Sequence, residues 1–209
     1  TNRLLIVGEP GAGKTSLLRR LALDWISPTE DDASDEHTVA CIPIYISLRH
    51  WGSPRDVTAT LKNTLTNTGG AWINDNLHDL AERGTLVLLL DGLDEIGDSA
   101  RAQIIDWIHM FSAAYPKSQV VVTTRPHVQG ALLHGFTHVA IKPFDTNQVR
   151  DFAYRRLFKK KSWRVFVSCF RECHDMWNVL GNPLMLSMAT YLYQRSDIVP
   201  QNSAQLIRD

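Results

Sequence analysis

The sequence predicts an α/β domain with a five-stranded parallel sheet flanked by helices, followed by an all-helical subdomain. Apolar runs alternate with helical patterns over residues 1–144, as expected for strands that are joined by helical crossovers. The run TLVLLLD at residues 85–91 is typical of a strand that is buried on both faces of a parallel sheet. After residue 144 only helical patterns remain. We therefore assign residues 145–209 to a helical subdomain, which we expect to be incomplete.

The elements of the first domain follow in chain order. The expected strands are rich in β-branched and apolar side chains, and they span residues 3–7, 42–48, 85–91, 119–125 and 138–144. The expected helices have apolar side chains at helical spacing or stop at glycine; one begins near Lys14, and the others span residues 54–68, 71–83 and 99–114. Parallel strands need crossover connections, and these are right-handed almost without exception.

Composition excludes several classes of protein. The chain has 209 residues, of which 44% are hydrophobic and 21% charged, so it can bury a core without disulfides. Its 22 basic residues equal its 22 acidic ones, and we expect no direct nucleic-acid binding from such a neutral chain. Three cysteines are too few for a disulfide framework, which favours a cytoplasmic location. No run of apolar residues is long enough to span a membrane.

The first strand leads into the segment GEPGAGKT, which matches G-x-x-x-x-G-K-[ST]. Glycines let backbone N–H groups turn toward phosphate oxygens, Lys14 supplies a charge for the β- and γ-phosphates, and the Thr15 hydroxyl can ligate Mg²⁺. The start of the following helix adds a partial positive charge. We therefore predict a P-loop NTPase whose nucleotide-binding residues include Gly8, Glu9, Pro10, Gly11, Ala12, Gly13, Lys14, Thr15 and Ser16.

An acidic segment follows the third strand. Asp91 ends the strand at the sheet edge where ligands bind in open α/β folds, so we assign it to Mg²⁺ together with Thr15. Asp94 and Glu95 come next in the same loop, and either could polarise the water that attacks the γ-phosphorus. The sequence leaves open which of the two is the base.

The strand VVVTTR ends in polar residues that suit the same edge. An additional catalytic carboxylate is typical of the P-loop branch that inserts a strand between the P-loop strand and the Asp91 strand. The expected strand order is then 5-1-4-3-2. Thr123, Thr124 and Arg125 would emerge beside the γ-phosphate, where Arg125 can pair with it in a catalytic role.

These motifs together resemble a NACHT domain of the STAND class of signalling NTPases. The similar segments are GEPGAGKTSLLRRLA, IPIYISLR, LLLDGLDEI, VVVTTRP and GNPLMLSMATYLYQ, and the resemblance covers essentially the whole chain. It implies a switch that holds ADP, exchanges it for ATP with Mg²⁺, hydrolyses ATP slowly and forms homo-oligomers on activation. It also implies that Pro183 packs on the adenine.

The resemblance further implies partners within a longer protein. In this family a winged-helix domain follows the helical subdomain and closes over the nucleotide, and sensor and effector domains make up a signalling or innate-immune receptor. No winged helix is recognisable in these residues. We therefore expect the chain to be an excised core whose partners are the missing winged-helix, sensor and effector domains.

Other functions remain as alternatives. An AAA+-like remodelling or loader ATPase shares the same order of motifs, but residues 127–137 contain no Arg or Lys that could serve as an arginine finger. A small-molecule kinase would need a lid rich in arginine.

Cys169, Cys173 and His174 suggest a metal corner, yet no second pair of ligands accompanies them, so we interpret the cysteines as structural. We interpret Lys159–Lys161 beside Trp163 as charges at a helix end rather than a nucleic-acid contact.

Overall fold

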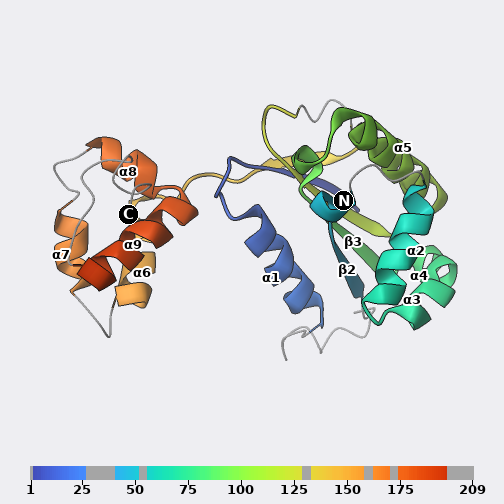
Figure 1. Ribbon diagram of the computed structural model, residues 1–209, viewed down its shortest axis with the longest axis horizontal. Coiled ribbons are helices and arrows are strands. Elements are labelled where there is room, and N and C mark those ends of the chain that lie inside the picture. Colours follow the sequence, from blue (N-terminus) through green and yellow to red (C-terminus); the bar gives the residue numbers. More distant parts are fainter. Residues whose placement is uncertain are drawn as a thin grey trace. The chain divides into compact units, whose positions relative to one another are not determined.

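The computed structural model describes residues 2–26, 41–51, 56–128, 133–157, 162–169 and 174–196. Its elements form two compact units (Figure 1). The first unit contains residues 1–9 and 14–140, and the second contains residues 10–13 and 141–209. The short stretch 10–13 therefore belongs with the helical part of the chain, although it lies within the P-loop motif.

The first unit is built on a parallel five-stranded sheet. Its strands are β1 (Arg3–Val7), β2 (Ile42–Ser47), β3 (Leu86–Asp91), β4 (Gln119–Thr124) and β5 (Thr137–Ala140). They lie side by side in the order β2-β3-β4-β1-β5, and every pair is parallel. This is the predicted order 5-1-4-3-2, so the insertion of β4 between the P-loop strand and the acidic strand is confirmed.

Helices cover both faces of this sheet. They are α1 (Lys14–Ile26), α2 (Val57–Asn67), α3 (Ala71–Asp75), α4 (Leu77–Arg83) and α5 (Asp98–Ala114), with short 3-10 turns η2 (Leu48–His50) and η3 (Leu93–Glu95). Figure 1 shows α1 on one face and the helices from α2 to α5 on the other. The expected single helix over residues 71–83 is divided at Asn76, whose side chain donates a hydrogen bond back to the carbonyl of Trp72.

The core of the first unit lies around β3. All six residues of this strand are buried, as the sequence predicts for a central strand with helices on both faces. Ile104 and Ile108 of α5 are fully buried in the same cluster. At the edge of the sheet opposite β2, β5 is exposed throughout and ends at Ala140, short of the expected residue 144. Among the described strands it pairs with β1 alone, and Pro143 farther along has no N–H with which to resume the ladder.

The second unit is helical. It contains α6 (Thr146–Leu157), α7 (Trp163–Ser168), α8 (His174–Leu180) and α9 (Pro183–Ser196), which enclose a core of their own with Phe166 and Leu186 fully buried. Asp145, the residue before α6, caps this helix. The Asp145 carboxylate accepts the backbone N–H groups of Asn147 and Gln148, and the Gln148 side chain accepts the N–H of Asp145, which is a capping box.

No helix among the described residues combines the length and the apolar character that crossing a membrane requires.

Candidate functional site

Lys14 is placed by the turn that joins β1 to α1. The N–H of Gly8 donates to the carbonyl of Thr124 at 3.2 Å, so the loop starts directly from two adjacent strand ends. The ammonium group of Lys14 donates to the carbonyls of Gly8, at 2.6 Å, and Glu9, at 3.2 Å. These contacts fold the lysine back over the loop, at the sheet edge where β1 and β4 end.

Opposing effects act on the charge of Lys14. Partial burial lowers its pKa below the ordinary value, and the positive charge of Arg125 acts in the same direction. Asp94 is the strongest of the nearby carboxylates that raise the pKa, followed by Asp91. An anionic ligand at this position would favour the protonated lysine, because opposite charge stabilises the charged form.

The Asp91 carboxylate is held by three hydroxyl groups from three different elements. Thr15 of α1 donates to Oδ2 at 2.7 Å, and Tyr45 of β2 donates to the same oxygen at 2.9 Å. Thr123 of β4 donates to Oδ1 at 2.6 Å. Asp91 itself is 8% exposed. A buried carboxylate needs such partners, and here they also fix its direction.

This arrangement suits a hard divalent cation. Thr15 gives its proton to Asp91, so the lone pairs of its hydroxyl oxygen remain free to ligate a metal ion. Hydroxyl and carboxylate oxygens are the ligands that Mg²⁺ prefers, and Mg²⁺ typically takes only one or two protein ligands beside phosphates and waters. The sequence predicted Thr15 and Asp91 as the metal residues, and the structure brings the two side chains together.

The acidic loop after β3 carries Asp94 and Glu95 on η3. Gly92 adopts a φ of 84°, a left-handed conformation that other residues rarely adopt, and this turn brings the loop back over the sheet edge. The side chain of Asp94 is only 3% exposed and its Oδ2 pairs with Nε of Arg125 at 2.8 Å. Its Oδ1 is buried and has no partner among the described residues. Glu95, in contrast, is exposed.

Arg101 braces this loop, a role that no sequence motif indicates. Its guanidinium donates to the carbonyls of Leu93, at 3.1 Å, and Ile96, at 2.7 Å, and it pairs with Asp98 at 2.8 Å. These bonds hold both ends of the segment that carries Asp94. The i, i+3 spacing of Asp98 and Arg101 was visible in the sequence, but the two backbone acceptors were not.

The polar end of β4 departs in part from expectation. Both threonines were predicted to lie beside the γ-phosphate. Instead the hydroxyl of Thr123 is occupied, because it donates to Asp91 and accepts the N–H of Gly92 at 2.9 Å. Thr124 is buried, and its hydroxyl has no partner among the described residues, so it is the one of the pair with unused hydrogen-bonding capacity.

The remaining P-loop residues pack within the second unit. Asn182 caps α9 and donates from its side-chain amide to the carbonyl of Pro10 at 2.7 Å, while the N–H of Leu184 donates to the carbonyl of Gly11 at 3.3 Å. Gly11 has a φ of 76°, and a Cβ there would lie 2.7 Å from Oδ1 of Asn182. Pro183 is the first residue of α9, where its fixed φ suits a helix start.

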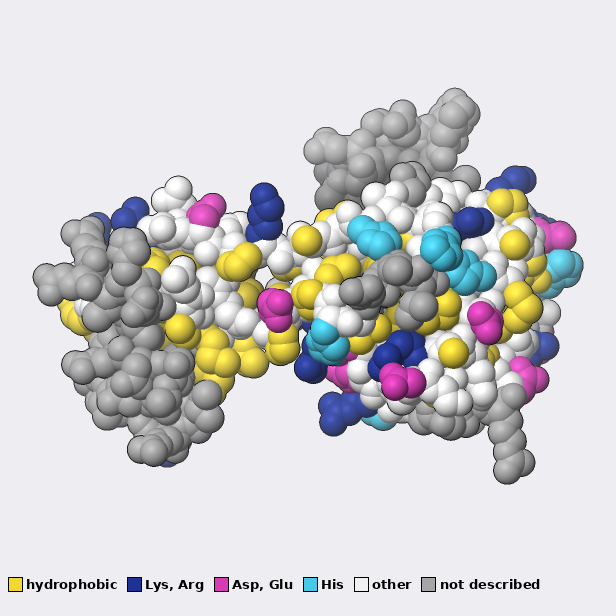
Figure 2. Space-filling view, turned by 90° about the horizontal axis from the view of Figure 1, so that it is seen from above, with side chains coloured by type: hydrophobic (Ala, Val, Ile, Leu, Met, Phe, Trp, Pro, Cys, Tyr) yellow, Lys and Arg dark blue, Asp and Glu magenta, His cyan; other side chains and the backbone are white. Residues whose placement is uncertain are grey.

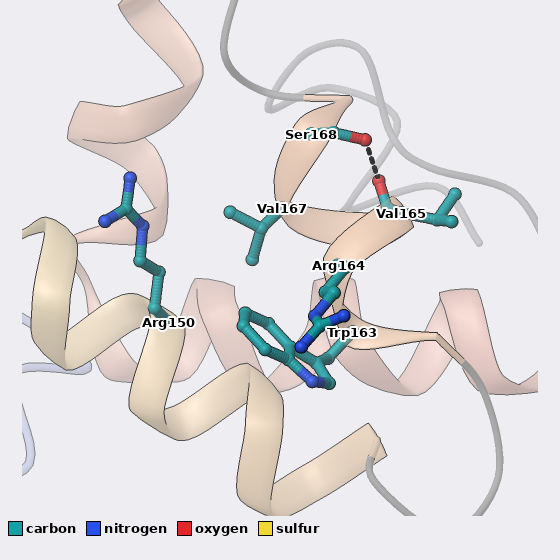
Figure 3. A pocket seen from close by; sticks show the side chains of 6 residues that line it. All are labelled: Arg150, Trp163, Arg164, Val165, Val167 and Ser168. Carbon is teal, nitrogen blue, oxygen red and sulfur yellow. Dashed lines mark hydrogen bonds between the residues drawn. The ribbon is translucent and has the colours of Figure 1, made fainter.

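A further hollow among the described residues contains none of the predicted site residues. A hollow of about 480 Å³ in the second unit is lined by Arg150, Trp163, Arg164, Val165, Val167 and Ser168. In Figure 3, Val167 and Trp163 face the space between α6, which carries Arg150, and α7. The Arg164 guanidinium lies over the Trp163 ring, 5.6 Å from its centroid. Lys159–Lys161 and Cys173 lie outside the described residues.

Histidine side chains gather on the face of the first unit that Figure 2 shows, and the rings of His109 and His134 stack with centroids 6.5 Å apart. Within the described residues, no group of three or more His, Cys, Asp or Glu side chains is arranged to hold a metal ion. The predicted Mg²⁺ residues are of a different kind, a threonine and an aspartate.

Comparison with known proteins identifies the family. The family model for the NACHT domain matches residues 2–161. Comparison with curated proteins gave no significant match.

Several solved structures share the fold. A Walker-type ATPase of Pyrococcus abyssi is 17% identical with a TM-score of 0.59, over 97% of this chain and 65% of that protein. AMPPCP-bound DnaA of Aquifex aeolicus is 16% identical with a TM-score of 0.53, over 94% of this chain and 56% of DnaA. A STAND protein of Pyrococcus horikoshii with a tetratricopeptide-repeat sensor is 16% identical with a TM-score of 0.50, over 90% of this chain and 27% of that protein. The chain thus spans less than two thirds of each protein.

Proposed function

The chain belongs to the NACHT domain family, and from this premise we propose that it is an ATP/ADP switch that hydrolyses ATP slowly with Mg²⁺. The observation that carries the proposal is the cluster at the carboxyl ends of β1, β3 and β4. There Lys14 lies near Asp91 and Asp94, Thr15 contacts Asp91, and Arg125 contacts Asp94. A phosphate site, a metal site and a base with a cationic neighbour are the parts that phosphoryl transfer to water requires.

The charged side chains then have separate roles. Lys14 binds the β- and γ-phosphates, and when bound, Mg²⁺ supplies further positive charge against the phosphate oxygens. Arg125 uses its Nε on Asp94, which leaves the donors of its two terminal nitrogens for the γ-phosphate. Pro183 contacts the adenine, as it does in the family.

Asp94 is the better candidate for the base. Its unpartnered Oδ1 can accept a hydrogen bond from the attacking water and then its proton, while Arg125 holds Oδ2. Glu95 is exposed, so we assign it a supporting role at most.

Turnover of ATP by single variants tests this assignment. We expect Asp94→Asn to bind ATP at nearly the wild-type affinity. Its rate of hydrolysis should fall by about 100-fold or more, since a positioned base contributes about 10²–10⁴-fold. Glu95→Gln should keep most of the activity. Asp106→Asn, an exposed carboxylate on α5, is the matched control. Phosphate release at saturating ATP and Mg²⁺ is the readout, and the assignment is wrong if Asp94→Asn turns over like the wild type.

The wider role rests on the family resemblance. We propose that ATP promotes homo-oligomers, that ADP favours the inactive form, and that the chain serves a cytoplasmic signalling or defence receptor together with winged-helix, sensor and effector domains. Light scattering of a longer chain that includes those domains, with ADP or a non-hydrolysable ATP analogue, tests the oligomer. Equal mass with both nucleotides would contradict a switch of this kind.

A further inference from the structure

Tyr45 contacts the metal aspartate from the outermost strand of the sheet. It lies on β2, two residues before Ser47, which is the register partner of Asp91 on β3. Its hydroxyl reaches Oδ2 of Asp91 at 2.9 Å, from the side opposite the β4 strand that supplies Thr123. Nothing in the sequence motifs points to this residue, since IPIYISL is an ordinary strand pattern.

The ring of Tyr45 is itself held in place. The guanidinium of Arg19 lies over the ring, 5.6 Å from its centroid. Arg19 follows Thr15 by four residues, so both side chains lie on one face of α1. One helix face therefore contacts Asp91 through Thr15 and the tyrosine through Arg19. Both Tyr45 and Arg19 also line a hollow of about 520 Å³, together with residues of α2.

The hydrogen bonds leave the Asp91 carboxylate little freedom. Each carboxylate oxygen has two lone pairs, and both of those on Oδ2 are taken, one by Thr15 and one by Tyr45. Thr123 takes one on Oδ1. If the tyrosine hydroxyl were removed, Oδ2 would have a free lone pair and the carboxylate could turn away from Thr15. The hydroxyl of Thr15 would then no longer be held with its lone pairs toward the cation.

We propose that Tyr45 is a positioning residue for Mg²⁺ in the nucleotide site, acting only through Asp91 and Thr15. The proposal rests on the proposed function, because it needs a Mg²⁺–nucleotide complex at the sheet edge. Among the described residues, Tyr45 makes no hydrogen bond to Lys14 or Gly13, the residues that we assign to the phosphates. It should therefore affect the metal-dependent part of nucleotide binding and leave the metal-independent part unchanged.

The test is a titration of fluorescent mant-ADP in EDTA and at a series of Mg²⁺ concentrations, with Tyr45→Phe against the wild type. The substitution removes one hydroxyl and keeps the ring under Arg19. The affinity for mant-ADP in EDTA should stay within about twofold of wild type. The Mg²⁺ concentration for half-maximal effect should rise about tenfold, because loss of a hydrogen-bond partner of a metal ligand typically lowers metal affinity by about 10- to 100-fold. Tyr115→Phe, which loses a hydroxyl bonded to His78 at 3.0 Å, is the matched control.

The outcomes separate this proposal from the proposed function. If the wild type binds mant-ADP with a Mg²⁺ response and Tyr45→Phe responds identically, the role of Tyr45 is refuted and the proposed function stands. If Tyr45→Phe loses affinity equally in EDTA and in Mg²⁺, the hydroxyl supports the fold or the loop in general, and the proposal is also refuted. If the wild type shows no Mg²⁺ response, both proposals fail.

Discussion

At the sheet edge, the buried side chain of Asp94 pairs with an arginine that solvent reaches. Asp94 is 3% exposed on its side chain, and its one ionic partner among the described residues is Arg125, which is 39% exposed. A buried charge that loses its partner destabilises a protein far more than a broken surface pair does. Loss of Arg125 should therefore destabilise the fold, apart from any effect on the proposed catalysis.

We expect Arg125→Ala to lower the free energy of unfolding by about 1–3 kcal/mol, less than for a fully buried pair because water reaches the arginine. The matched control is Arg155→Ala, which breaks a surface pair with Asp151. The Arg155 side chain is 79% exposed and that of Asp151 is 70% exposed. The control should change stability by less than about 1 kcal/mol. Urea unfolding without nucleotide measures both, and equal losses would show that Asp94 does not depend on its partner.

Among the elements, the phosphate loop is shaped by contacts as well as by its motif. Gly8 and Gly13 occupy the fixed glycine positions of G-x-x-x-x-G-K, while Gly11 occupies a variable one. In the second unit the start of α9 explains this extra glycine, because Asn182 and Leu184 leave no room for a Cβ. The same α9 start supplies Pro183, so the loop and the proposed adenine contact come from one packed region.

Comparing two glycine variants isolates that contact. Gly11 and Gly13 have φ angles of 76° and 91°, so alanine is strained at both, by about 1–2 kcal/mol. A Cβ at Gly13 would meet nothing within 4 Å, whereas one at Gly11 would lie 2.7 Å from Asn182 and 2.8 Å from Leu184. Gly11→Ala should therefore be the more destabilising in urea unfolding. If the two variants lose the same stability, the packing against α9 contributes nothing.

At the scale of the whole molecule, the sequence predicted the sheet because its signals are local. Apolar runs mark buried strands, and the acidic residues after Asp91 implied the inserted β4 and hence the strand order. Side chains of the motif also come together as expected, Thr15 with Asp91 foremost. These predictions needed only residue type and spacing.

The contacts that the sequence could not predict join distant elements. Tyr45 reaches Asp91 across neighbouring strands, and Arg101 braces the acidic loop through backbone carbonyls, which carry no signature in the sequence. Thr123 was correctly placed at the sheet edge, but its hydroxyl turns to Asp91 because that buried carboxylate needs a donor.

The most direct test of the central claim is calorimetric titration of the chain with ADP in the presence of Mg²⁺. Lys14→Ala removes a charged contact worth about 1.5–3 kcal/mol, so we expect affinity to fall roughly 10- to 100-fold. Lys62→Ala, which removes an exposed lysine on α2, should bind like the wild type. Equal affinity of Lys14→Ala and wild type, or no binding by the wild type, would contradict a nucleotide site at this loop.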